Sequence, residues 1–500
     1  MAAQICCVDQ ERPGARVIAG RWFCEEHYQK AVYKRAGVWR TGIVAVVGLL
    51  IFVAAVVAVD TYLQLQLSGA VLLGTGVVLA LVPAALWLIF FYQQDRLEPE
   101  PVGNVARMFV IGLALAGAFG IPLTDQFFGV QDWLYRDSAT TWLASIFVIG
   151  AVEAFMIFAT VRYFIFDSPE FDERTDGVIY GTAAGLGYAT ALNLQFILGS
   201  GGAALGPGEI YVAEVALAQA AFGGLLGYFL GRAKLEQEPV WWLPAALGLV
   251  TLLNGLFMVL RGQLDQGTIS VAGQGAGLPS VTGLLLAGGL AIVVTAAVSV
   301  LINRDISRSL ADKQPPATAD PTIGDRRANF AAIGTFMVLL AIGAFAWYNA
   351  VSRAQTFEAG GFRGAYPDFF SESTAEGDVI RVTDLFGTGA EFSIATLPLS
   401  GSETAEAVAG ALAGSRSTDY AIYKVLNSGR VTVNDKIAYT QQFAYVDPRG
   451  LTGAAPEVLQ GRDYIFIESG RAVIVTLLTT PADLASVEPQ FARFLNSLTW

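Results

Sequence analysis

Nine long apolar stretches constrain this chain more than any other feature of its sequence. Each has between 19 and 26 residues, enough to cross a hydrocarbon core of roughly 30 Å as a helix that rises 1.5 Å per residue. Only helices satisfy all the backbone polar groups of such isolated stretches inside lipid. The sequence therefore predicts a polytopic α-helical membrane protein with about nine transmembrane helices, at residues 41–59, 67–92, 108–128, 141–163, 177–199, 210–231, 239–260, 281–302 and 330–350.

Composition agrees with this class and excludes another. Of the residues, 54% are hydrophobic and 15% are charged, against about 25% charged in an average soluble domain. The 43 acidic residues outnumber the 31 basic ones, for a net charge of -12. Because nucleic-acid binding depends on neutralising phosphates with positive charge, no nucleic-acid partner is expected. The expected partners are the lipid bilayer and a membrane-protein client or signalling partner.

The distribution of basic residues predicts the orientation of the helices. With nine spans and the N-terminus inside, eighteen Lys and Arg residues fall on the cytoplasmic side, and only Arg136 and Arg261 fall in the short outer loops. Basic residues gather on the cytoplasmic side of membrane proteins. The segment before the first span is too long and too charged for a signal peptide. We therefore expect a multi-pass cell-membrane protein whose N-terminus is cytoplasmic and whose C-terminal domain is extracytoplasmic.

Changes in composition divide the chain into five parts. The linker contains a cluster of prolines, which is typical of a flexible connection. The parts are a cytoplasmic head (1–40), an eight-helix transmembrane bundle (41–302), a cytoplasmic linker (303–329), a ninth transmembrane helix (330–350) and an extracytoplasmic domain (351–500).

The head contains all the cysteines and the single histidine of the chain. Two residues separate Cys6 from Asp9, and two separate Cys24 from His27, a spacing that lets both side chains of a turn reach one metal ion. Thiolate and imidazole ligands suit zinc. The sequence predicts a small zinc-knuckle-like head with a structural zinc held among Cys6, Cys7, Asp9, Cys24 and His27. The alternative is a short disordered tail with reduced thiols.

Polar side chains at bilayer depth form the second candidate site. Such groups are costly in lipid and normally face a partner or a cavity. Four consecutive predicted helices carry them within one to two turns of a common level, which predicts a shared polar pocket. Its residues are Glu153, Asn193, Gln219 and Asn254. Interhelical hydrogen bonds with only a packing role explain the same spacing equally well.

Three tracts resemble a known family. Residues 92–101 read YQQDRLEPEP, residues 176–188 read DGVIYGTAAGLGY and residues 227–234 read GYFLGRAK. They are similar to the DR-x-EPEP signature, the D-G-x-x-Y-G-x-x-x-G-x-G-F stretch and the sixth-helix end of PrsW-type intramembrane metalloproteases. The resemblance covers roughly residues 92–261 and implies the helical bundle of an intramembrane protease.

The catalytic residues that this resemblance implies are not intact. Where the family has E-E-x-x-K, residues 152–156 read VEAFM and keep only Glu153; where it has F-x-x-x-E-N, Leu192 replaces the glutamate. The family's two histidines fall on Gln219 and Asn254. A catalytic zinc needs about three ligands from His, Cys, Asp or Glu, and the bundle has no His or Cys. No zinc is therefore predicted in the bundle.

Two classes of function remain open. The first is a pseudoprotease, a catalytically degenerate family member that acts as a membrane sensor, scaffold or binding protein. The second is an intramembrane metalloprotease of the same type with an altered active site, for which Glu153 and Glu214 are the candidate acids. A transporter is less favoured, because no inverted repeat is visible.

The C-terminal region predicts an α+β domain. Its ends, GFRGAYP at 361–367 and FLNSL at 494–498, resemble PsbP-like extracytoplasmic domains. Turns are predicted at 427–429, 434–435 and 468–470. The predicted strands are 379–383, 391–397, 419–426, 430–434, 437–446, 464–468 and 472–478, and the predicted helices are 403–414 and 486–498.

Overall fold

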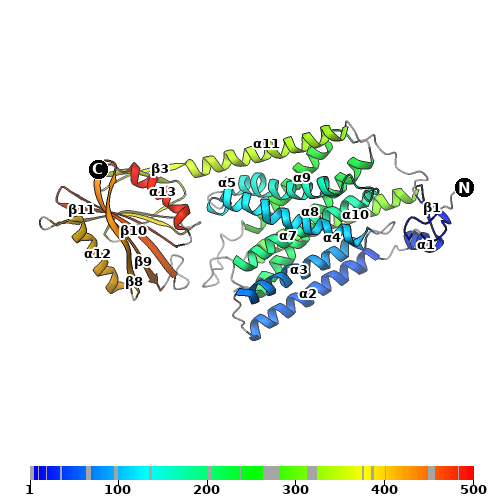
Figure 1. Ribbon diagram of the computed structural model, residues 1–500, viewed down its shortest axis with the longest axis horizontal. Helices are drawn as coiled ribbons and strands as arrows, with labels where there is room; N and C mark the ends of the chain where they lie inside the picture. The colour runs from blue at the N-terminus through cyan, green and yellow to red at the C-terminus, as the bar shows by residue number, and fades with distance from the viewer. Residues whose placement is uncertain are drawn as a thin grey trace. The chain divides into compact units, whose positions relative to one another are not determined.

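The protein is described by a computed structural model that forms two compact units (Figure 1). The first unit contains the head and most of the helical bundle, and the second contains the C-terminal domain. The described residues are 5–9, 11–18, 20–33, 37–63, 69–94, 100–134, 138–199, 205–236, 238–262, 281–311, 324–373, 377–384, 388–399, 401, 403–420, 422–448, 457–481 and 483–500.

Long apolar helices build the first unit. Their cores are almost entirely Ala, Val, Leu, Ile, Gly and Phe, so each helix satisfies its own backbone and presents side chains to lipid or to its neighbours. They are α2 (Gly37–Leu63), α3 (Gly69–Tyr92), α4 (Val102–Leu115), α5 (Ser138–Ala144), α6 (Ala151–Phe164), α7 (Arg174–Gly199), α8 (Leu205–Leu235), α9 (Trp242–Gly262), α10 (Val281–Ala311) and α11 (Gly324–Ser352).

Among the described residues, eight helices are long and apolar enough to cross a membrane, which confirms a polytopic helical protein. The predicted fifth span corresponds to α7, which has 26 residues but is not among these eight. Glycines and polar residues lower its hydropathy, and most of its side chains are buried by neighbouring helices. A helix enclosed by protein does not need a lipid-compatible surface, so nine spans remain our proposal.

Two spans contain wide turns. The third predicted span continues from α4 through two π-helical segments, η1 (Ala116–Gly120) and η2 (Pro122–Phe127), where Pro122 and Asp125 interrupt the apolar run. Asp125 accepts a hydrogen bond from Gln195 of α7 at 2.6 Å. The fourth span joins α5 to α6 through a third π-helical segment, η4 (Ser145–Gly150). Such segments are frequent near functional sites, and η4 lies just before Glu153.

The predicted linker is shorter than expected. Helix α10 extends to Ala311 and α11 begins at Gly324, so both ends of the 303–329 range are helical. Polar residues continue a membrane helix readily once it has left the lipid, which hydropathy alone does not reveal. The proline cluster of the linker lies outside the described residues.

The head is a small unit on its own elements. Strands β1 (Arg16–Ile18) and β2 (Arg21–Phe23) pair antiparallel, and α1 (Glu25–Tyr33) follows directly. Gly20, with φ of 84°, lies in the turn between the strands. This arrangement brings the 6–9 loop and the start of α1 together.

The second unit is an α+β domain built on a seven-stranded antiparallel sheet of order β5-β6-β7-β11-β10-β9-β8. Buried residues of β11 alternate between its two faces, with Val473 and Val475 packing in the core that contains α13, and Ala472 and Ile474 in the core that contains α12. The strands are β5 (Ser371–Ser373), β6 (Asp378–Thr383), β7 (Glu391–Pro398), β8 (Tyr423–Val433), β9 (Lys436–Asp447), β10 (Glu457–Glu468) and β11 (Arg471–Thr479), and the helices are α12 (Ala405–Asp419) and α13 (Leu484–Ser497).

Two turn predictions are confirmed and one is wrong. Asn434 and Asp435, with φ of 49° and 62°, connect β8 to β9, and Ser469 and Gly470 connect β10 to β11. The predicted turn at 427–429 is wrong, because β8, an edge strand with a bulge between Val425 and Asn427, continues through these residues and pairs with β9. A further hairpin, β3 (Ala354–Ala359) with β4 (Phe362–Pro367), was not predicted.

Candidate functional site

Three buried polar side chains in the bundle form one hydrogen-bonded group, here called the polar triad. They are Glu153 of α6, Gln219 of α8 and Asn254 of α9, each no more than 5% exposed. The Gln219 amide nitrogen donates to Glu153 Oε2 at 2.7 Å and to Asn254 Oδ1 at 3.0 Å. Three of the four predicted pocket residues therefore meet.

Glycines allow the helices to approach closely at this level. A Cβ atom on Gly150 would lie 2.4 Å from the backbone oxygen of Thr251, and one on Gly255 would lie 2.5 Å from Cα of Ile146. The end of η4 and the middle of α9 are therefore in backbone contact. Small residues permit such contacts between membrane helices, and this contact sets Asn254 beside Glu153.

The backbone of α9 determines the direction of the hydrogen bonds in the triad. Asn254 Nδ2 donates to the carbonyl of Val250 at 3.1 Å, so its Oδ1 faces Gln219 as an acceptor. Gln219 must then present its NH₂ group to Asn254, and the same NH₂ group faces Glu153. The carboxylate of Glu153 is consequently met by a hydrogen-bond donor, and the Gln219 Oε1 atom is buried without a partner among the described residues.

Asn193, the fourth predicted pocket residue, is not brought to the triad. Its Nδ2 donates to the carbonyl of Val212 on α8 at 2.9 Å, so it joins α7 to α8 elsewhere. The prediction placed Asn193 by depth in the membrane, and depth does not give the direction in which a helical side chain points. Leu192, beside it, is half-buried.

Two buried polar residues near this level were not assigned to the pocket by the sequence. Thr251 is fully buried, and its hydroxyl has no partner among the described residues. Glu214 of α8 is 8% exposed, and neither of its carboxyl oxygens has a partner there. Thr251 precedes Asn254 by three residues, so helical spacing could have indicated it; no pattern in the sequence indicates that the Glu214 carboxyl lacks a partner.

Comparison with known proteins decides the family. The family model described as PrsW family intramembrane metalloprotease matches residues 100–284. Protease PrsW of Halalkalibacterium halodurans is 31% identical over 180 residues, which cover 36% of this chain and 79% of that protein. The chain belongs to the PrsW family. Protease PrsW of Geobacillus kaustophilus and that of Bacillus subtilis are 28% and 26% identical, over 74% and 78% of their lengths.

The head and the C-terminal domain lie outside the PrsW match. Among solved structures, the chain is similar to cyanobacterial PsbP of Synechocystis, with 14% identity over 30% of this chain and 93% of that one, at a TM-score of 0.25. It is also similar to the Ran-binding protein Mog1p of Saccharomyces cerevisiae, with 10% identity over 29% of this chain and 95% of that one, at a TM-score of 0.23.

Residues of two family tracts meet in the structure. The Tyr180 hydroxyl donates to the Glu100 carboxyl, and the Tyr92 hydroxyl donates to the Glu100 carbonyl at 2.6 Å. Burial raises the pKa of Glu100. Asp176 accepts from the backbone of Asp172 at 2.7 Å and so ties the preceding loop to α7. These contacts give the two tracts a structural role; residues 95–99 of the first lie outside the described residues.

The metal that the PrsW family name implies does not fit the polar triad. A catalytic zinc needs about three anionic or imidazole ligands and an open position for water. Here one carboxylate faces two amides, and the group nearest to it is the Gln219 NH₂, which carries no lone pair for a metal. The triad can hold a hydrogen-bond network, and we assign no metal-dependent step to it.

The head contains four potential metal ligands. The ligand atoms of Cys6, Asp9, Cys24 and His27 all lie within 4.8 Å of one another. His27 Nδ1 is 3.4 Å from Cys6 Sγ, 3.3 Å from Cys24 Sγ and 3.7 Å from Asp9 Oδ2. Ligands of a tetrahedral zinc lie roughly 3.3–3.8 Å apart. The geometry fits zinc; Cys7, the fifth predicted ligand, is not part of the group.

The head is joined to the bundle by ion pairs. Arg21 of β2 lies 2.7 Å from Asp172 and 2.9 Å from Glu173, in the loop before α7. The thiols of Cys6 and Cys24 are both buried in the head. These ion pairs attach the head to the loop that Asp176 anchors.

Proposed function

We propose that this protein is a pseudoprotease of the PrsW family, which has kept the helical bundle of the family and lost its peptidase chemistry. The observation that carries the proposal is the Gln219 amide, which donates to both Glu153 and Asn254. Gln219 and Asn254 stand at the positions where the resemblance places the family's two histidines. Amides are poor zinc ligands and cannot act as general bases. A buried network of one carboxyl and two amides stabilises helix packing and does not activate water.

The proposed role is that of a membrane sensor, scaffold or binding protein. The head carries a structural zinc, held by Cys6, Asp9, Cys24 and His27, and its Arg21 contacts the loop before α7. The last span carries the C-terminal domain outside the cytoplasm. Such a chain connects a folded cytoplasmic unit with an extracytoplasmic one through a rigid bundle, and a membrane protein or signalling partner is its expected client.

The competing function is an intramembrane protease with an altered site. It would have to use Glu153, which the family pattern retains, because the other candidate acid, Glu214, has no hydrogen-bond partner to position it among the described residues. A lost general base costs about 10²-fold or more in rate. Cleavage that depends on Glu153 is therefore the decisive property.

The test is a cleavage assay on the full chain in proteoliposomes with single-pass membrane proteins as substrates. We expect no cleavage by the parent or by Glu153→Gln. An active PrsW relative, such as the protease of Bacillus subtilis, reconstituted in parallel shows that the substrates are accessible. Cleavage by the parent that disappears in Glu153→Gln overturns the proposal, whereas cleavage equal in both chains identifies a contaminating protease.

A further inference from the structure

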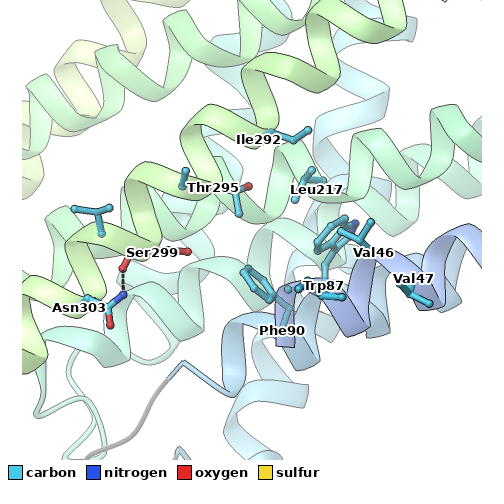
Figure 2. A pocket seen from close by; sticks show the side chains of 13 residues that line it. Val46, Val47, Trp87, Phe90, Leu217, Ile292, Thr295, Ser299 and Asn303 are labelled. Carbon is cyan, nitrogen blue, oxygen red and sulfur yellow. Dashed lines mark hydrogen bonds between the residues drawn. The ribbon is translucent and has the colours of Figure 1, made fainter. Parts of the chain in front are cut away.

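An apolar cavity of about 590 Å³ opens on the side of the bundle between α2, α3 and α10 (Figure 2). Trp87 and Phe90 of α3 form one wall, and the Trp87 indole is fixed by a hydrogen bond to the carbonyl of Ala213 at 3.3 Å. Leu217 of α8 also lines the cavity. Residues of α2 and α10 form the remaining walls, including Val46, Val47, Ile292, Ala296 and Val300.

This cavity is separate from the polar triad. Leu217, which lines it, and Gln219, which belongs to the triad, are two positions apart on α8, so their side chains point roughly 200° apart around the helix. The body of α8 lies between the two sites. The cavity is therefore not an entrance to the triad, and its occupant need not be a protease substrate.

One end of the cavity is polar and lies at a membrane boundary. Gly42 begins the apolar run of α2, and Asn303 directly follows the span predicted from sequence at residues 281–302, so both lie near the same membrane boundary. Thr295, Ser299 and Asn303 follow one another at four-residue intervals on the cavity side of α10 (Figure 2). Ser299, at 8% exposed, is the most buried of the three.

Positive charge continues this polar end. Asn303 donates one amide hydrogen to the Ser299 carbonyl at 2.8 Å and retains a second. Arg304 follows it, exposed, and has no ion-pair partner in the described parts of the chain. An apolar slot that ends at an amide, with an exposed arginine at the next position of the same helix, matches a molecule with a hydrocarbon chain and an anionic head.

We propose that this cavity binds one anionic phospholipid of the bilayer, with an acyl chain against Trp87 and Phe90 and the phosphate at Asn303 and Arg304. The cavity accommodates one acyl chain, with the rest of the lipid at its open side, and its volume falls within the roughly 300–1,000 Å³ of small-molecule sites. A membrane-spanning helix of a partner is the alternative occupant, and the cross-linking experiment below distinguishes it.

The experiment measures lipid bound to the full chain in detergent by native mass spectrometry, with added phosphatidylglycerol or phosphatidylcholine. Ala296→Phe places a ring in the cavity, and its matched control, Ala297→Phe, places the same ring on the next exposed residue of α10, outside the cavity lining. We expect one tightly retained phosphatidylglycerol in the parent and in Ala297→Phe, and loss of it in Ala296→Phe.

A second pair of variants tests the head-group contact. Arg304→Gln should lower the preference for phosphatidylglycerol over phosphatidylcholine about fivefold, the effect of one basic residue at a membrane surface. Arg326→Gln, which removes an exposed arginine of α11, should leave the preference unchanged. Equal retention in the parent and in Ala296→Phe overturns the proposal.

A photoreactive diazirine analogue of an aliphatic side chain, placed at Ile292 of the cavity lining, identifies the occupant in membranes without filling the cavity. A phospholipid adduct supports the proposal. A protein adduct at this position, without a lipid adduct, shows that a membrane-spanning partner fills the cavity and overturns it.

Discussion

Replacing Glu153 by glutamine and by leucine distinguishes a hydrogen-bonding role from a catalytic one. In the structure Glu153 Oε2 accepts one hydrogen bond of 2.7 Å from Gln219. A glutamine at 153 can accept the same bond through its amide oxygen, so the free energy of unfolding should change by no more than about 1 kcal/mol. A leucine leaves the Gln219 NH₂ short of an acceptor in a buried site, which should cost about 1–3 kcal/mol.

Glu214 provides the matched control for this series. It is a second buried carboxyl in the bundle, but neither oxygen has a hydrogen-bond partner among the described residues. Replacing it by leucine removes an unsatisfied polar group, so Glu214→Leu should leave the free energy of unfolding unchanged or raise it. Both leucine variants delete a carboxyl, but only Glu153→Leu is expected to lower the free energy of unfolding.

The assay is unfolding of the purified full chain in mixed micelles by titration with sodium dodecyl sulfate, followed by tryptophan fluorescence. The reasoning is refuted if Glu153→Leu is as stable as the parent, because the Gln219 bond would then contribute nothing. It is equally refuted if Glu153→Gln is as damaging as the leucine variant, since that would require a role for the negative charge.

Three further predictions follow from the same structure. The purified chain should contain about one zinc, measured by atomic emission. Cys24→Ser, which removes one of the four ligands in the head, should abolish zinc binding, whereas Cys7→Ser should not. Zinc retained by a chain truncated to begin at Arg40 would contradict this prediction. Cysteines introduced at Ser168 and Ser417 should react with impermeant reagents from the inside and the outside of the membrane; labelling of both from one side would mean a miscounted span. Gly227→Ala should destabilise the bundle by about 1–3 kcal/mol or more, because its Cβ would lie 1.8 Å from the Gly177 oxygen of α7, while Gly248→Ala, whose Cβ meets no atom within 4 Å, should be neutral under the same titration.

The helices of the bundle could be predicted from sequence because hydropathy and helical rise depend only on position along the chain. Hydropathy over about 20 residues predicts a membrane helix without knowledge of its neighbours, and helical rise places Glu153, Gln219 and Asn254 at similar depth. Rotation about the helix axis needs the neighbours. Asn193 has the predicted depth, but its side chain bonds to Val212. Helix α7 is enclosed by other helices, so its low hydropathy does not indicate that it crosses the membrane.

The C-terminal domain shows a different limit. Asn434 and Asp435 predict a turn correctly because both adopt positive φ, which these residue types tolerate. Asn427, Ser428 and Gly429 have an equally turn-like composition, yet they pair with β9 in an edge strand. Long-range pairing decided the outcome there, and a local pattern does not contain that information.

The most direct test of the central claim is the zinc content of the bundle. It is measured in a Cys24→Ser background, which removes the site in the head, after equilibration of the full chain with a small excess of zinc. The account predicts no bound zinc in this chain, and uptake of about one zinc when Gln219→His and Asn254→His place two imidazoles beside Glu153 in the triad. One zinc bound without those changes, and lost on Glu153→Gln, would contradict the account and restore a metal site to the bundle.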